Sequence, residues 1–153
     1  MSADTDLIKL YSARILALAA DIPHLGRLDN PDATVKRRSP LCGSTVTMDV
    51  RVADGRLAAL GQEVKACALG QAAAAVAGGA APGAPLETIR KGRDQLRDML
   101  KGKGGVPDAP FDGFEVLLPA VDYKNRHASI MLSMEAIVEA MEEASSPARI
   151  GEL

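Results

Sequence analysis

The chain has 153 residues, of which 47% are hydrophobic and only 3% aromatic, so we expect one domain, residues 1–153, with a core of aliphatic and alanine side chains. Its formal net charge of -2 and its pI near 5.7 exclude the strongly basic surface that binds nucleic acid or an anionic membrane. The first six residues are polar and no apolar run approaches ~18 residues, so we expect a soluble, cytoplasmic protein with no membrane partner.

The first half of the chain combines one helix with three strands. Apolar residues at helical spacing predict a helix from about Thr5 to Ala20. The polar stretch from Asp29 to Pro40 is typical of a weak edge strand. Alternation over residues 45–52, followed by the turn dipeptide Asp54-Gly55, predicts a hairpin whose second strand runs from residue 56 to about 64. The basic cluster Lys36-Arg37-Arg38 is either a solvated strand edge or a docking patch for an acidic partner.

The second half is predicted to be mainly helical. We expect a helix over residues 68–77 that Gly78-Gly79 ends, and an amphipathic helix from residue 86 to about 101. The short apolar segment 114–118 ends at Pro119, and the last helix runs from residue 126 to about 144. Strands early and helices late favour an α+β fold with a small antiparallel, about three-stranded sheet and helices packed on one face.

The two cysteines, Cys42 and Cys67, stand at the same end of the predicted hairpin. Cys67 lies at a strand-to-helix junction, where unpaired backbone N–H groups would stabilise a thiolate. Gly43 beside Cys42 would let the backbone approach a ligand. Each cysteine alone could instead be a buried packing residue, since free cysteine is among the most buried residue types. Their shared position favours a metal site.

The histidines and the glycine-rich loop carry weaker signals. His127 starts the last helix and is either a polar capping residue or a ligand, whereas His24 is expected in a loop. The segment Lys101-Gly102-Lys103-Gly104-Gly105 is similar to a phosphate loop in composition only, so we interpret it as a flexible connection.

Several segments resemble the U-type iron-sulfur cluster assembly scaffold family, which includes IscU, SufU and the N-terminal domain of NifU. The residues that carry the resemblance are Leu10-Tyr11, Pro23-His24-Leu25-Gly26, Pro40-Leu41-Cys42-Gly43, Cys67-Ala68-Leu69-Gly70-Gln71-Ala72 and Arg126-His127-Ala128-Ser129-Ile130-Met131-Leu132. The spacing of the two cysteines also matches the family, and the linker and long helix before the last motif resemble the SufU-like branch. The fold implied is the SufE/NifU-like arrangement.

The resemblance also identifies departures from the family pattern. Ser44 stands where the family has an aspartate, and Ser129 stands where it has a third cysteine. Two of the four expected ligands are therefore hydroxyls, which do not ionise near neutral pH and suit soft metals poorly. His127 could supply a third ligand, but positions 127 and 129 point to nearly opposite sides of a regular helix. His127 would reach the site only if the helix began after it.

The function that the resemblance implies is an iron-sulfur cluster assembly scaffold-like protein, not an enzyme, acting as a monomer or weak dimer. A cysteine desulfurase would deliver sulfur to Cys42 and Cys67, iron would join, and a labile iron-sulfur cluster would pass to acceptor proteins. The implied metal ligands are Cys42, Cys67, His127, Ser129 and Ser44. Three alternatives stay open: a zinc-dependent sulfur acceptor, a ligand-depleted relative that serves as an interaction module, and a reversible thiol pair.

Overall fold

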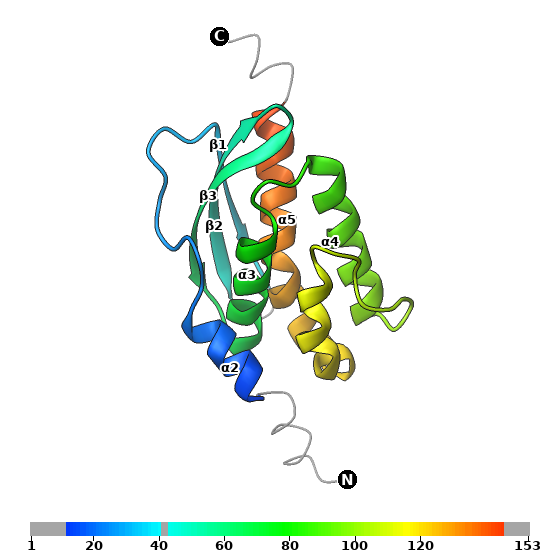
Figure 1. Cartoon of the computed structure of the whole chain (residues 1–153). Helices are drawn as coiled ribbons and strands as arrows, with labels where there is room; N and C mark the ends of the chain where they lie inside the picture. Colours follow the sequence, from blue (N-terminus) through cyan, green and yellow to red (C-terminus); the bar gives the residue numbers. More distant parts are fainter. Residues whose placement is uncertain (1–11, 41–42, 146–153) are drawn as a thin grey trace.

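A computed structural model describes residues 12–40 and 43–145 (Figure 1). In chain order its elements are α2 (Ala13–Ala20), β1 (Ala33–Arg38), β2 (Thr45–Ala53), β3 (Arg56–Lys65), α3 (Ala68–Ala80), α4 (Leu86–Leu100), the 3-10 helices η1 (Asp112–Asp122) and η2 (Lys124–Arg126), and α5 (His127–Ala144). The α+β class predicted from the sequence is confirmed.

The sheet has three antiparallel strands in the order β1-β2-β3. Its central strand, β2, buries Val46, Met48 and Val50, as the alternating pattern predicts. The β2–β3 turn is made by Asp54 and Gly55, which have φ of 53° and 74°, as a tight hairpin turn requires. Because β1 pairs only with β2 among the strands of residues 12–40 and 43–145, the prediction of an edge strand is also confirmed.

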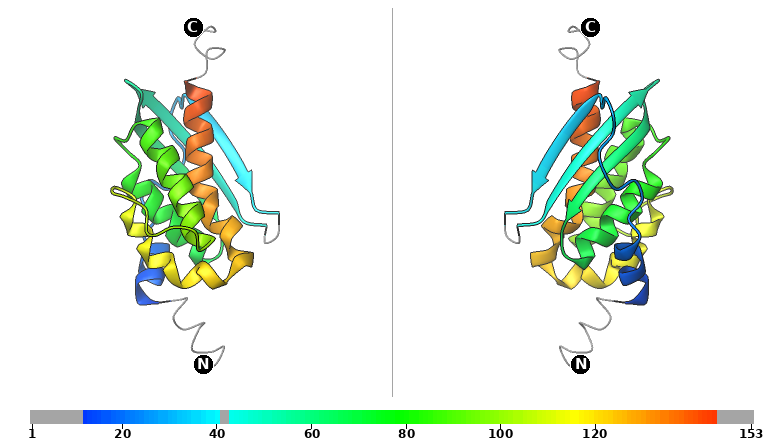
Figure 2. Two further views of the ribbon diagram at one scale, coloured as in Figure 1. Left: turned by 90° about the vertical axis from the view of Figure 1, so that its right-hand side faces the viewer. Right: turned by 90° about the vertical axis from the view of Figure 1, so that its left-hand side faces the viewer.

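The helices cover one face of the sheet. Helices α3 and α5 pack together, α5 lies against β1 and β2, and α4 lies on the outer side of α5 (Figure 2, left). Helix α5 is the centre of the core and buries Ile130, Met134, Ile137 and Met141 completely. None of the helices within residues 12–40 and 43–145 is long and apolar enough to cross a membrane.

The segment of residues 21–32 runs across the opposite face of the sheet (Figure 2, right). It covers Asp49 of β2, which is fully buried. Asp49 accepts hydrogen bonds from Arg27 Nε at 2.7 Å, Arg27 Nη2 at 3.1 Å, Leu28 N at 3.0 Å and the hydroxyl of Thr34. Burial tends to raise the pKa of Asp49, but the hydrogen bonds from Arg27, Thr34 and Leu28 outweigh it, so the pKa lies below its ordinary value.

The helix boundaries differ from the sequence prediction in three places. Ser12 is the N-cap of α2 and accepts a hydrogen bond from Ile15 N at 3.3 Å, so an uninterrupted helix from Thr5 is wrong; residues 1–11 lie outside the described part. Helix α3 continues through Gly78 and Gly79 to Ala80. Gly78 is a packing residue, because a Cβ there would lie 2.5 Å from Gln62 Nε2.

The third difference concerns Pro119, which does not end an apolar segment but lies inside η1. The fixed φ of proline suits a 3-10 helix, which is why the chain continues helically through this residue. The segment 114–118 is thereby part of a longer 3-10 helix that leads toward the start of α5.

Candidate functional site

A thiol and two hydroxyl groups meet at one end of the sheet. The Sγ atom of Cys67 lies 3.6 Å from Ser129 Oγ, and Ser129 Oγ donates a hydrogen bond to Ser44 Oγ at 3.2 Å. Cys67 is the N-cap of α3, Ser129 lies in the first turn of α5, and Ser44 immediately precedes β2. We name this group the Cys67–Ser129–Ser44 cluster.

The strand register explains why these three residues meet. Thr45 at the start of β2 is paired with Lys65 at the end of β3, so Ser44 and the β3–α3 junction lie at the same end of the sheet. Helix α5 packs against β2 and α3 and brings its first turn between them. The register therefore places Ser44 and Cys67 at one end of the sheet, whereas the predicted proximity of the two thiols stays a prediction, because Cys42 lies outside the described residues.

The loop from β1 to β2 is closed by backbone hydrogen bonds. Ser39 N donates to Ser44 O at 2.8 Å, and Gly43 N donates to Ser39 O at 3.0 Å. Gly43 has a φ of +71°, a conformation that favours glycine. Cys42 lies outside the described residues, so its role as a ligand stays a prediction.

The three residues of the cluster differ in how far solvent reaches them. The side chain of Cys67 is partly exposed, whereas Ser44 is 4% and Ser129 only 2% exposed. A molecule that approaches from solvent would therefore meet the thiol first, with the hydroxyls behind it. Neutral hydroxyls are poor ligands for soft metals. Residues 12–40 and 43–145 contain no group of three His, Cys, Asp or Glu side chains that could hold a metal ion.

Gly70 is a site residue whose importance the sequence analysis missed. It lies in α3 and is buried. A Cβ at this position would lie 2.5 Å from Ser129 Oγ and 2.8 Å from Ala66 Cβ. The available signal was an isolated glycine inside a predicted alanine-rich helix, which often marks a close packing contact.

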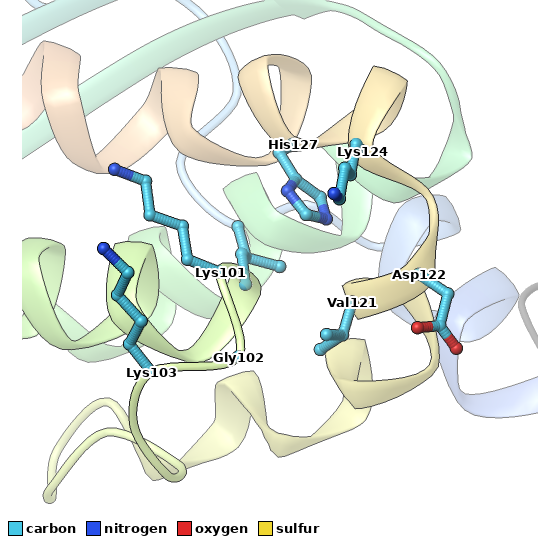
Figure 3. A pocket seen from close by; sticks show the side chains of 8 residues that line it. Lys101, Gly102, Lys103, Val121, Asp122, Lys124 and His127 are labelled. Atoms are coloured by element: carbon cyan, nitrogen blue, oxygen red, sulfur yellow. The ribbon is translucent and has the colours of Figure 1, made fainter.

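His127 is the first residue of α5 and faces a different part of the surface. Its Nε2 atom forms a 2.9 Å hydrogen bond with the carbonyl oxygen of Ala120, for which Nε2 must be the donor. The ring lines a hollow of about 710 Å³ between the end of α4 and the η1–η2 segment (Figure 3). The hollow is lined by Leu100, Lys101, Gly102, Lys103, Val121, Asp122, Lys124 and His127. The role of His127 as a third ligand stays a prediction.

The remaining segments singled out by the sequence have structural roles. His24 is an exposed loop residue with a φ of 61°, and its carbonyl accepts a hydrogen bond from Gln62 N. Gly102, with a φ of 74°, follows the last turn of α4. The N–H groups of Gly102 and Lys103 donate hydrogen bonds to carbonyl oxygens of that last turn. Arg37 of the basic cluster forms ion pairs with Glu135 at 3.7 Å and Glu139 at 3.3 Å, which tie β1 to α5.

Three solved structures are similar to this chain. A NifU-like protein (N-terminal) from Brucella abortus, described as nitrogen-fixing, is 37% identical with a TM-score of 0.88, over 91% of this chain and 96% of its own. A hypothetical protein is 20% identical with a TM-score of 0.78, over 88% of this chain and 98% of its own. A candidate iron-sulfur cluster assembly scaffold protein for the SUF system from Fervidobacterium islandicum AW-1 is 17% identical with a TM-score of 0.80, over 88% and 98%.

The last two structures, at 20% and 17% identity, show a shared fold. No protein-family model and no curated protein matches the chain. The Brucella protein is different, because 37% identity extends over nearly the full length of both chains. The chain therefore belongs to the NifU-like, U-type iron-sulfur cluster assembly scaffold family.

Proposed function

We propose that the protein acts in iron-sulfur cluster assembly as a scaffold-like protein rather than as an enzyme. Iron, sulfur or a labile cluster is its cargo, and Cys67 and Cys42 are the thiols that hold it. One observation carries the proposal. The three described positions that the resemblance identified as family ligand positions, 44, 67 and 129, form a single hydrogen-bonded cluster.

The chemistry of this cluster differs from a site with four strong ligands. Thiolates bind iron and accept sulfur, whereas the hydroxyls of Ser44 and Ser129 are at best weak ligands. Cargo held by two thiolates is bound loosely and leaves easily, which suits a protein that passes its cargo on. A cysteine desulfurase would supply the sulfur and acceptor proteins would take the product. His127 is the proposed third protein ligand, but it could bind only if its hydrogen bond with Ala120 O broke and the helix began after it, since His127 is the first residue of α5 in the structure.

The test is anaerobic incubation of the purified chain with ferrous iron and sulfide, followed by absorption spectroscopy and elemental analysis. We expect thiolate-to-iron charge-transfer bands that disappear in Cys67→Ala and Cys42→Ala and are largely kept in Ser145→Ala, a matched small substitution on the exposed C-cap of α5. Zinc in place of iron in the purified protein would favour the zinc-dependent sulfur acceptor. A protein that stays colourless and free of metal would contradict the proposal.

A second candidate function is a ligand-depleted interaction module that binds a partner without carrying cargo. The observation that favours it is that neutral hydroxyls, those of Ser44 and Ser129, lie beside Cys67 where the family pattern has an aspartate and a third cysteine. The double variant Ser44→Asp, Ser129→Cys separates the two functions, because it restores the ligand types of the family pattern. Binding of iron by the natural chain supports the scaffold. Binding by the double variant alone supports the interaction module.

A further inference from the structure

We infer that the hollow between the end of α4 and the η1–η2 segment binds a small molecule that carries a chain of linked phosphate groups. Three lysines from two parts of the chain, Lys101, Lys103 and Lys124, line this hollow and supply the positive charge. We name it the lysine hollow. It is a second binding site, and it does not depend on the thiols that hold the proposed cargo.

The walls of the lysine hollow carry an excess of positive charge. Three lysines and one carboxylate, that of Asp122, line it, which gives a formal net charge of +2 with His127 counted as neutral. The whole chain, in contrast, has a net charge of -2. Within residues 12–40 and 43–145 none of the three lysines forms an ion pair. A hollow lined mainly by one sign of charge concentrates ions of the opposite sign, so this one attracts anions.

A second charged hollow, between β1, α4 and α5, provides a comparison within the same molecule. Its volume is about 290 Å³. The charged residues that line it are Arg37, Arg93, Arg97, Glu135, Glu139 and Glu142. Three guanidinium groups are thus matched by three carboxylates, and Arg37 is paired with two of these. The second hollow is therefore balanced by the protein's own side chains, whereas the lysine hollow is not.

The end of helix α4 explains two of the lysines but not the third. Lysines near a helix C-terminus interact favourably with the helix dipole, which accounts for Lys101, the C-cap of α4, and for Lys103. Lys124 belongs to a separate element, η2. Figure 3 shows Lys101 and Lys103 extended side by side from the end of α4, and Lys124 beside the His127 ring across the hollow. A ligand that spans the hollow gives all three lysines a common role.

The chemistry of the walls favours a chain of phosphates over a single small anion. The N–H groups of Lys101, Gly102 and Lys103 already donate to carbonyl oxygens of α4 at 3.1, 3.1 and 2.8 Å, so they cannot cradle a phosphate as the backbone of a phosphate loop does. Recognition is left to the ammonium groups, which act as point charges on flexible stems. A volume of about 710 Å³ is typical of small-molecule sites. Only a ligand with several linked charges can reach lysines on both walls.

Titration calorimetry of the chain with tripolyphosphate, without iron, sulfide or divalent cations, tests the inference. We expect saturable binding of one equivalent that weakens at least about threefold between about 50 and 200 mM salt, because the charges involved are exposed. Each of Lys101→Gln, Lys103→Gln and Lys124→Gln should weaken binding by about three- to tenfold, and the triple variant should abolish it. Lys36→Gln is the matched control, because Lys36 is an exposed lysine of β1 in the basic cluster outside the hollow. Its affinity should stay within about twofold of the natural chain.

Further probes identify the source of the phosphate chain. Tighter binding of ATP than of tripolyphosphate would identify a nucleotide as the ligand, and an affinity for ATP that is no higher would identify the phosphate chain alone. Inorganic phosphate that binds as tightly as tripolyphosphate would overturn the inference. Tighter binding of hexaglutamate would also overturn it, because the hollow would then suit an acidic peptide.

Two results would refute the site outright. One is no saturable binding of tripolyphosphate or ATP at millimolar concentration, and the other is a loss in Lys36→Gln as large as in the three hollow variants. Circular dichroism confirms that each variant is folded at the assay temperature. The double variant Cys42→Ala, Cys67→Ala should bind tripolyphosphate like the natural chain. Failure of this inference is therefore distinguishable from failure of the proposed function.

Discussion

Replacing Asp49 with asparagine tests how the segment 21–32 is held on the outer face of the sheet. The carboxylate is fully buried and accepts four hydrogen bonds, two at each oxygen. Asparagine has the same shape but offers one oxygen, and its amide group donates rather than accepts. In Asp49→Asn at least one N–H donor of Arg27 or Leu28 therefore faces the amide N–H groups, whereas the hydroxyl of Thr34 can turn and accept.

The expected loss of stability follows from these contacts. A hydrogen bond to a charged acceptor contributes about 1.5–3 kcal/mol, and an unpaired buried donor carries a further penalty. The side chain of Arg27 is 52% exposed, so its guanidinium can turn toward water in the variant, which reduces the loss. We expect the free energy of unfolding to fall by about 2–4 kcal/mol at neutral pH.

The loss should depend on pH in a defined direction. The folded-state pKa of Asp49 lies below its ordinary value, so its ionised form stabilises the fold above the unfolded-state pKa of about 4. That contribution is lost as the pH falls through the lowered folded-state pKa. The stabilities of the natural chain and of Asp49→Asn should therefore differ most near neutral pH and converge in acid.

Urea unfolding followed by far-ultraviolet circular dichroism measures both effects, since the chain contains no tryptophan. Asp54→Asn is the matched control, because Asp54 is exposed in a turn that asparagine adopts readily. We expect the control to stay within about 0.5 kcal/mol of the natural chain. Equal stability of Asp49→Asn and the natural chain at neutral pH, or a difference that does not shrink in acid, would refute this reasoning.

Other predictions concern packing and surface charge, each measured by the same urea unfolding. Gly92→Ala should destabilise the fold by about 1–3 kcal/mol, because the added Cβ would lie 2.5 Å from the ring of Phe111. Unchanged stability would contradict this prediction, because it would mean that the Phe111 ring moves aside at no cost. Gly79→Ala should stabilise the fold by about 0.5–1 kcal/mol, since this helical position is exposed and a Cβ there would have no neighbour within 4 Å. A loss of stability would contradict the helical conformation of Gly79. Glu142→Ala should change stability by less than about 1 kcal/mol, because its ion pair with Arg90 is exposed; a larger loss would contradict the surface description.

Local sequence patterns predict much of this fold because they reflect local physical constraints. The alternation of Val46, Met48 and Val50 with polar residues follows from one buried sheet face, and Asp54-Gly55 follows from the backbone geometry of a tight turn. Gly78 and Pro119 misled the prediction of helix ends. The first is a glycine because Gln62 packs against it, and the second is compatible with a 3-10 helix. Both reasons are tertiary and invisible in local sequence.

The candidate site was predictable to the extent that strand pairing determines it. A hairpin necessarily brings the start of β2 beside the end of β3, and Cys67 and Ser44 follow from that register. The approach of Ser129 to Gly70 depends instead on how α3 and α5 pack, which no periodicity specifies. The hydrogen bond of His127 with Ala120 likewise depends on how the 3-10 segments enter α5.

Cadmium titration of the reduced protein tests the central claim most directly, because thiolate-to-cadmium charge-transfer absorption reports the sulfur atoms bound to each ion. If Cys42 and Cys67 hold one ion together, the natural chain should bind one equivalent with the absorption of two thiolates. Either single cysteine-to-alanine variant should then bind far more weakly, with half the absorption. Single variants that keep the affinity of the natural chain would show that the two sulfur atoms act separately, which would contradict the account.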